Sequence, residues 1–367
     1  MSDITKPTLR ERLDSVPARI TLSIVSMVVT VVVLGGGFVY LRDNAATAPR
    51  VIVALTALTI GVGGIWALYF SLNGLAEVLP ETARDKVLPW VFLGPALVSL
   101  GFFLVWPSLN TLWLSFFERG EYVGLANYIF IFQSSAMRTV LVNTVLWVVL
   151  VPTVATSLGL LIAVMTDRFS TTSEKVVKSL IFLPMAISFV GASVIWRFVY
   201  AYQPPGLPQI GLLNAIVTFF GADPVAWIII RPWNNLLLMF IMVWLQTGFA
   251  MVILSAAVKG VPKDLLEAAR IDGANEVRSF FSVTIPYIAG TILTVGTTIL
   301  FLVLKIFDVV YVMTSGQHGT NIVALRMYQE AFQFRNFGRG SALAVFLFVV
   351  VIPLLIQNVR SMREKSF

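Results

Sequence analysis

Eight long stretches of the chain contain no Asp, Glu, Lys or Arg. A helix needs about 20 apolar residues to cross the ~30 Å hydrocarbon core of a bilayer. Inside lipid every backbone N–H and C=O group must be satisfied within its own segment, so each stretch is expected to be a helix. The stretches cover residues 20–41, 51–76, 87–117, 139–166, 179–196, 232–258, 279–304 and 340–359.

The composition fits a multi-pass membrane protein and excludes other classes. Hydrophobic residues make up 57% of the chain and charged residues 12%, whereas a soluble domain carries about 25% charged residues. Cysteine is absent and His318 is the one histidine, which excludes a Cys/His zinc site and a Cys-ligated cluster. We therefore predict an all-α, polytopic transmembrane bundle of eight spans, with no metal or cofactor bound by this chain.

The positive charges predict the orientation of the bundle. Most of the 26 Lys and Arg residues fall on one side when the N-terminus is placed in the cytoplasm. Cytoplasmic loops are enriched in these residues, so both termini are expected to be cytoplasmic. The net charge of +7 follows from this topology and does not indicate nucleic-acid binding. The predicted organisation is a cytoplasmic tail (1–19), two N-terminal helices (20–76) and a six-span core (88–360) with an extracytoplasmic loop (198–231) and a cytoplasmic loop (259–286).

The extracytoplasmic loop is uncharged at its start but cannot be a continuous helix. Pro204, Pro205 and Pro208 lie within five residues of one another, and proline interrupts a helix. We expect a short interfacial helix at about 210–220.

The cytoplasmic loop carries the pattern of a helix on a membrane surface. Pro262 suits the start of a helix, and Asp264 suits its positive N-terminal end. Gly273 allows the backbone conformation that ends the helix, and a second helix is expected from about 275 to 281. Apolar side chains are expected to form one face of the first helix, which then needs a partner groove. They are Leu265, Leu266, Ala268, Ala269 and Ile271.

At this loop the sequence resembles a known family. Glu267-Ala-Ala-x-x-Asp-Gly273, followed nine residues later by Val283-x-Ile285-Pro286, is similar to the EAA signature of bacterial binding-protein-dependent ABC importer permeases. The family pattern has Ile and Leu where this chain has Val283 and Ile285. The resemblance runs from about Leu88 to the C-terminus and is strongest with the sugar branch. The segments that carry it are 89–116, 124–128, 307–316 and, in the manner of α-glucoside and maltose permeases, 335–344.

The resemblance implies a type I importer permease in the bacterial inner membrane that forms half of a sugar pathway, for a disaccharide or α-glucoside. The implied partners are a second homologous permease, two ATPase subunits, a periplasmic solute-binding protein, the sugar and membrane lipids. ATP and Mg belong to the ATPase subunits, because this chain has no G-x-x-x-x-G-K-[ST] loop. The residues implied to couple to an ATPase subunit are Leu266, Glu267, Ala268, Ala269, Asp272, Gly273 and Ala274.

Polar and aromatic residues within spans are the candidates for contact with the sugar. Sugars are bound by hydrogen bonds to hydroxyl groups and by stacking on aromatic rings. For Gln246, an interhelical hydrogen bond is an equally open role. Lys305 and Asp308 are three residues apart and could instead form an ion pair on one helical face. The substrate candidates are Trp244, Gln246, Thr247, Phe249, Lys305 and Asp308.

Two other classes fit the sequence less well. An ion-coupled secondary transporter of small polar solutes typically has intramembrane carboxylates, and the eight stretches contain none. An enzyme would need a carboxylate pair or a nucleophile with its base, and no such set is recognisable. We therefore expect a transport subunit and not an enzyme.

Overall fold

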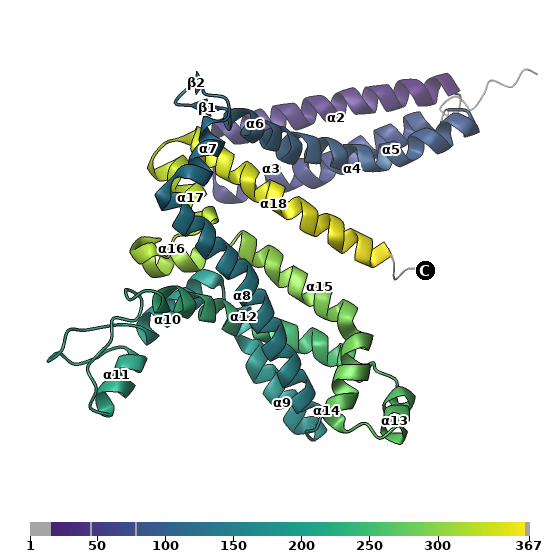
Figure 1. Ribbon diagram of the computed structural model, residues 1–367. Helices are drawn as coiled ribbons and strands as arrows, with labels where there is room; N and C mark the ends of the chain where they lie inside the picture. Colours follow the sequence, from purple (N-terminus) through teal and green to yellow (C-terminus); the bar gives the residue numbers. More distant parts are fainter. Residues whose placement is uncertain (1–15, 45, 78, 364–367) are drawn as a thin grey trace, which may run out of the picture. The chain divides into compact units, whose positions relative to one another are not determined.

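The computed structural model describes residues 16–44, 46–77 and 79–363, which are largely helical (Figure 1). The chain divides into two compact units, Met1–Leu109 and Asn110–Phe367. Most of the expected cytoplasmic tail, 1–19, lies outside the described residues; the helix α2 begins at Val16.

The first unit contains two helical stretches packed against each other and a third that leads out of the unit. Ser26 Oγ and Ser71 Oγ lie 2.7 Å apart and join α2 to α4. Large apolar side chains such as Val32 and Leu58 remain exposed, as expected for helices surrounded by lipid. The elements are α2 (Val16–Asn44), α3 (Arg50–Leu58), η1 (Thr59–Gly63), α4 (Gly64–Ala76), α5 (Glu81–Leu100), η2 (Gly101–Val105) and the start of α6 (Trp106–Leu114).

The second unit holds the rest of α6, a two-stranded hairpin and the remaining helices. Phe117 pairs with Tyr122 and Glu118 with Glu121 in the antiparallel hairpin. The elements are β1 (Phe117–Glu118), β2 (Glu121–Tyr122), α7 (Ala126–Gln133), α8 (Ser135–Thr166), α9 (Thr171–Phe182), η3 (Leu183–Ala186), α10 (Phe189–Val199), α11 (Leu212–Phe219), α12 (Trp233–Lys259), α13 (Lys263–Ile271), α14 (Glu276–Ser279), η4 (Phe280–Thr284), α15 (Ile285–Leu304), α16 (Asp308–Thr314), η5 (Gln317–Gly319), α17 (Val323–Tyr328), η6 (Gln329–Gln333) and α18 (Phe337–Arg363).

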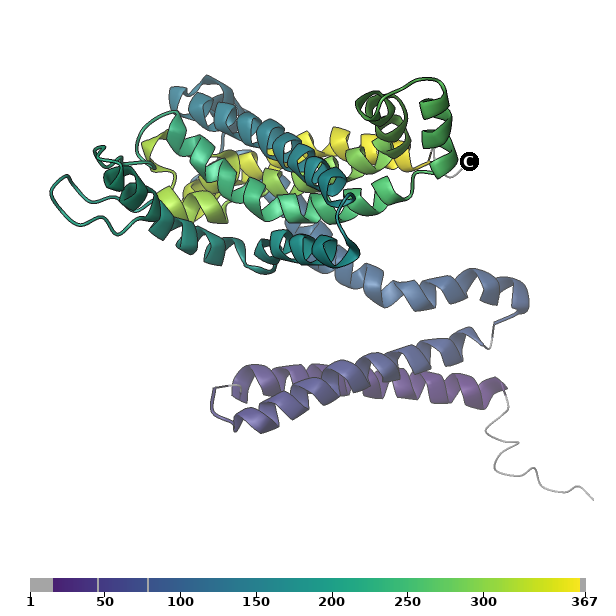
Figure 2. The same ribbon diagram turned by 90° about the horizontal axis from the view of Figure 1, so that it is seen from below.

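The core of this unit lies between α8, α12 and α15. The helices α8 and α12 form the most extensive helix–helix contact (Figure 1, Figure 2). Trp147 of α8 and Leu245 of α12 are almost completely buried, and the Trp147 indole donates a hydrogen bond of 2.8 Å to Asn235 Oδ1. This packing gives the unit a rigid centre around which the shorter helices are arranged.

The helices of the described residues account for six or seven of the eight expected spans. Among residues 16–44, 46–77 and 79–363, six helical stretches are long and apolar enough to cross a membrane. A bent pair formed by Thr171–Ala186 and Phe189–Val199 would make seven. The last predicted stretch, 340–359, lies within α18 (Phe337–Arg363), whose described apolar part includes Phe337–Pro353.

The bent pair corrects the prediction of a straight fifth span. The two arms meet at an angle of 102°. Pro184 lies in the short 3-10 turn that ends the first arm, and Ser188 caps the second arm by accepting a hydrogen bond of 3.1 Å from the Gly191 backbone N–H. A run without charges therefore showed that the segment is apolar but not that the helix is continuous.

The two ends of the second unit carry different features. In Figure 1 the helix α8 runs from an end with β1, β2, α7 and α17, here called the hairpin end, toward the end with α13 and α14. The 198–231 loop contains the short helix α11 within the expected region. Asn214 of α11 holds this loop through hydrogen bonds with Ala201, Val225 and Trp227.

Candidate functional site

The helix α13 is a short surface helix that ends in a defined turn. Gly273 has a φ of +80°, a conformation that side chains with a Cβ rarely adopt. The Gly273 N–H donates to Arg270 O at 3.0 Å, and the Ala274 N–H donates to Ala269 O at 2.9 Å. This pair of bonds is the Schellman arrangement that closes a helix. The chain then enters α14, where Asn275 Oδ1 accepts a bond of 2.8 Å from the Arg278 backbone N–H.

The side chains of α13 are open to solvent in the described part of the chain, where none of its residues is buried. Leu266 and Ala269 are half-buried against the rest of the unit. Leu265, Ala268 and Ile271 follow one another at three-residue spacing and are exposed, Ile271 by 86%. The five apolar residues lie on one broad face of the helix, as expected, with Leu266 and Ala269 at its half-buried edge. The exposed part of this face is an apolar stripe that the other described residues leave uncovered.

Charged side chains tie α14 and the neighbouring helix ends together. Arg168, which follows α8, contacts Glu276 of α14 at 2.6 Å. Glu174 of α9 pairs with Lys178 and, at 2.6 Å, with Lys259 at the end of α12. The Arg168–Glu276 pair is about two-thirds exposed on both sides, so its own contribution to stability is small. The Glu174 pairs join α9 to the end of α12, and the Arg168–Glu276 pair connects α14 to the end of α8.

The substrate candidates on α12 do not share one side of the helix. Successive residues are 100° apart, so Trp244 and Thr247 point to one side while Gln246 and Phe249 point to the opposite one. Thr247 is buried and its hydroxyl donates to Val243 O at 2.7 Å. Gln246 is 3% exposed, and its Oε1 has no hydrogen-bond partner among the described residues. Trp244 and Phe249 are half-buried.

An aromatic cluster next to Trp244 was not singled out from the sequence. Trp196 of α10 lies 5.6 Å from Trp244 and 5.3 Å from Phe240 between ring centroids. Phe240 is 48% exposed. It lies four residues before Trp244, a spacing that places both rings on one face, so helical periodicity could have identified it.

Lys305 and Asp308 do not form the ion pair that the sequence allowed. The helix α15 ends at Leu304, Lys305 is its exposed C-cap, and Asp308 begins the separate helix α16. In the part of the chain that the structure describes, no ion pair joins the two side chains. The three-residue spacing would have aligned them only on a continuous helix. The site residues predicted from the sequence therefore do not form one cluster. The coupling residues lie around α13, four substrate candidates lie on two sides of α12, and Lys305 and Asp308 lie where α15 ends and α16 begins.

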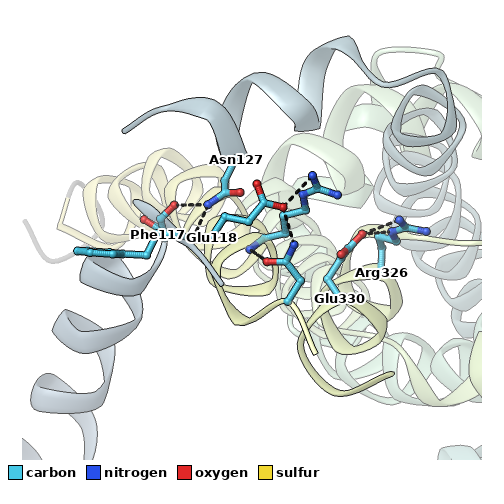
Figure 3. Close-up of polar contacts among 8 residues, drawn as sticks. Phe117, Glu118, Asn127, Arg326 and Glu330 are labelled. Carbon is cyan, nitrogen blue, oxygen red and sulfur yellow. Dashed lines mark hydrogen bonds and ion pairs between the residues drawn. The ribbon is translucent and has the colours of Figure 1, made fainter. Parts of the chain in front are cut away.

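Two segments that the resemblance singled out meet at the hairpin end. Asn127 Nδ2 donates to Ser115 O and Phe117 O, each at 2.9 Å, as Figure 3 shows for Phe117. Glu118 accepts a hydrogen bond from Asn336 at 2.9 Å and forms an ion pair with Arg339 at 2.9 Å. Segment 335–344 is thereby fastened to segment 117–128.

A second ion pair lies close to this junction. Arg326 contacts Glu330 one turn later at 2.5 Å, and Glu330 is 3% exposed (Figure 3). The guanidinium of Arg326 also lies 5.2 Å from the centroid of the Phe334 ring. The buried carboxylate therefore depends on one arginine for its charge compensation.

Comparison with known proteins identifies relatives over most of the chain. Residues 155–361 match the family model described as binding-protein-dependent transport system inner membrane component. The osmoprotective compounds uptake permease protein GgtC of Synechocystis sp. is 54% identical over 278 residues, covering 75% of this chain and 99% of the relative. The alpha-glucoside transport system permease protein AglF of Rhizobium meliloti is 43% identical over 333 residues, covering 86% of this chain and 98% of the relative.

A solved structure shares the fold. The structure, described as a bacterial ABC transporter involved in the import of the acidic polysaccharide alginate, aligns with a TM-score of 0.67 at 21% identity. The alignment covers 77% of this chain and 98% of the matched chain.

Proposed function

Because the chain belongs to the family of binding-protein-dependent transport system inner membrane components, we propose that it is the permease subunit of an ATP-driven sugar importer. It is a transport subunit of the inner membrane and not an enzyme. It provides half of the pathway, and a second homologous permease provides the other half. Two ATPase subunits hold ATP and Mg on the cytoplasmic side, where both termini of this chain lie, and a periplasmic binding protein delivers the sugar.

The single observation that carries this proposal is the uncovered apolar stripe of α13. An exposed amphipathic helix presents its apolar side chains for insertion into a groove of a partner protein. Leu265, Ala268 and Ile271 supply the apolar contacts, and Glu267 lies beside them. The Schellman turn at Gly273 links α13 to α14, and α14 continues through η4 into α15, so a displacement of α13 would move α15. ATP-driven closure of the ATPase subunits then shifts the permease between its inward-facing and outward-facing states.

The experiment compares two charge reversals that leave the fold of this chain untouched. Glu267→Lys places a positive charge on the exposed surface of α13. Asp223→Lys makes the same change in the exposed 198–231 loop and is the matched control. In membrane vesicles that contain the complete transporter, Glu267→Lys is expected to reduce sugar uptake and sugar-stimulated ATP hydrolysis at least about tenfold, whereas the control keeps both. Equal uptake in the two variants would contradict the proposed coupling role.

The substrate class follows from the relatives and from the aromatic cluster. One relative is named for alpha-glucoside transport, and the 335–344 segment resembles the same group. We assign a disaccharide or α-glucoside to this chain. In a pathway shared by two permeases, lining residues must be exposed in one isolated permease, and Phe240 meets this condition. Gln246 and Thr247 are buried and can reach the sugar only in a state where α12 separates from its neighbours.

A substitution in the aromatic cluster tests the sugar contact. Phe240→Ala removes an exposed ring and is expected to raise the KM for uptake about tenfold, equivalent to about 1.4 kcal/mol of lost stacking. Phe348→Ala removes a similarly exposed ring of α18 and is the control. Unchanged uptake kinetics in Phe240→Ala, together with normal amounts of protein, would exclude Phe240 from the sugar path.

A further inference from the structure

A cavity at the hairpin end is lined by positive and aromatic side chains. It has a volume of about 380 Å³ and lies where the end of α6, the β1–β2 turn and the start of α18 meet. Its volume falls within the range of about 300–1,000 Å³ that is typical of small-ligand sites. Its described lining carries two positive charges and no negative one. The lining side chains that matter are Trp113, Phe117, Arg119, Arg335 and Phe337.

The two arginines of this cavity are free to bind a ligand. Arg119 and Arg335 are exposed, and neither side chain makes a hydrogen bond or ion pair with any residue that the structure describes. Arg339 differs, because it forms an ion pair with Glu118 at 2.9 Å and thereby balances that acidic charge. A guanidinium group presents its N–H donors in a planar fork that matches the oxygens of a phosphate. Two such groups at one cavity favour an anion with phosphate chemistry.

The arginines stand at backbone positions where another residue type would fit better. Arg119 has a φ of +51° and Gly120 a φ of +92°, so these two residues form the tight turn between β1 and β2. A two-residue turn with positive φ at both positions favours Asn-Gly. Arg335 also has a positive φ, of +54°. Local conformation therefore does not account for arginine at either place.

The aromatic rings indicate the depth of the cavity in the membrane. Trp113 near the end of α6 is 62% exposed, and Phe337 at the start of α18 is 56% exposed. Exposed apolar residues continue along both helices, with Leu112 on α6 and Phe348 on α18. Aromatic rings at the ends of lipid-facing helices lie at the level of the phospholipid head groups. The cavity thus opens where a lipid phosphate is present at high local concentration.

We propose that this cavity binds the head group of an anionic phospholipid, with Arg119 and Arg335 on the phosphate and the Trp113 and Phe337 rings against the glycerol and acyl carbons. The negative charge of the lipid selects it over zwitterionic neighbours, because the lining carries no acidic group to repel it. The site is separate from α13 and from the aromatic cluster of α12, so it holds whether or not the sugar assignment does. Its occupation would fasten the β1–β2 turn to the start of α18.

The test measures lipid binding to the full chain, purified in neutral detergent with the subunits that accompany it. Native mass spectrometry follows a titration with phosphatidylglycerol. The double variant Arg119→Asn/Arg335→Asn removes both charges and keeps positive φ accessible, since asparagine adopts this conformation readily. Each arginine near an anionic lipid contributes about a fivefold affinity, so the double variant is expected to bind roughly 30-fold more weakly at this site. Arg138→Gln is the control, because Arg138 is exposed at the start of α8 outside the cavity.

Four results would overturn the proposal. The first is equal phosphatidylglycerol binding by the wild type and the double variant, and the second is equal binding of phosphatidylcholine by the wild type. Displacement of the lipid by millimolar inorganic phosphate would identify a site for free anions instead. Loss of a partner subunit from the double variant, with lipid binding unchanged, would show that the cavity is a protein interface.

Discussion

Replacement of Gly338 by alanine should break the junction at the hairpin end. A Cβ at this position would lie 1.6 Å from Phe117 O and 3.1 Å from Asn127 Nδ2. An ordinary contact between carbon and a carbonyl oxygen is about 3.3 Å, so the Phe117 carbonyl must move by roughly 1.7 Å. The hydrogen bond of 2.9 Å from Asn127 to that carbonyl would be lost. Overpacking costs about 1–3 kcal/mol and an unsatisfied buried polar group about 1–3 kcal/mol, and the better helix propensity of alanine returns up to about 1 kcal/mol.

The net destabilisation is therefore about 3 kcal/mol, which corresponds to a fall in Tm of roughly 4–6 °C. Thermal unfolding of the full chain in detergent, followed by tryptophan fluorescence, measures the change in Tm. Gly296→Ala is the matched control, because Gly296 is also helical and its added Cβ would lie 3.8 Å from Thr156 Oγ1, an ordinary contact. The control should be unchanged or more stable by up to about 1 kcal/mol. If Gly338→Ala unfolds at the same temperature as the control, the close approach of Gly338 to Phe117 does not hold this junction together.

Three further comparisons of variants test other parts of the structure. Arg326→Met should lower the free energy of unfolding by about 3–5 kcal/mol because it leaves the buried Glu330 carboxyl without its partner, whereas Arg168→Met, at an exposed pair, should lower it by at most about 1 kcal/mol. Equal losses in the two variants would contradict this contrast. Gly273→Asn should keep more uptake activity than Gly273→Val, because asparagine tolerates positive φ and a β-branched residue does not. The reverse order of activities would show that the positive φ of this turn is not what uptake requires. Asn214→Ala should make the 198–231 loop sensitive to limited proteolysis, because it removes the hydrogen-bond partners of the half-buried Val225 backbone groups. Wild-type resistance to the protease would contradict that role.

The apolar stretches were sufficient to predict the membrane helices but not their continuity. The length and the lack of charge of a stretch show only that it is apolar. They predicted the spanning helices at 139–166, 232–258 and 279–304 correctly because the helix is continuous in each of these segments. The fifth stretch has the same composition, yet Pro184 and the Ser188 cap divide it. The turn after α13 was predicted because glycine at the end of an amphipathic helix commonly adopts the positive φ that closes the helix.

The candidate site was harder to predict because it depends on which side of each helix is covered. Trp244 and Gln246 are chemically suited to a sugar, but the sequence could not show that they point in opposite directions relative to the packed neighbours of α12. Burial separates them: Gln246 is enclosed with an unpartnered oxygen, whereas Phe240 and Trp244 lie toward a side that this chain covers only in part.

The different burial of Phe240 and Gln246 would order their contacts with the sugar in the proposed two-permease pathway. The exposed ring of Phe240 is available in the state described here, and the Gln246 amide is not. An unpartnered buried oxygen is destabilised by about 1–3 kcal/mol relative to a hydrogen-bonded one. A movement of α12 that exposes Gln246 to a sugar hydroxyl would recover this energy, so the bound sugar would favour the moved state. Under the proposed function, stacking on Phe240 would therefore hold the sugar first, and a hydrogen bond to the Gln246 amide would stabilise the moved state.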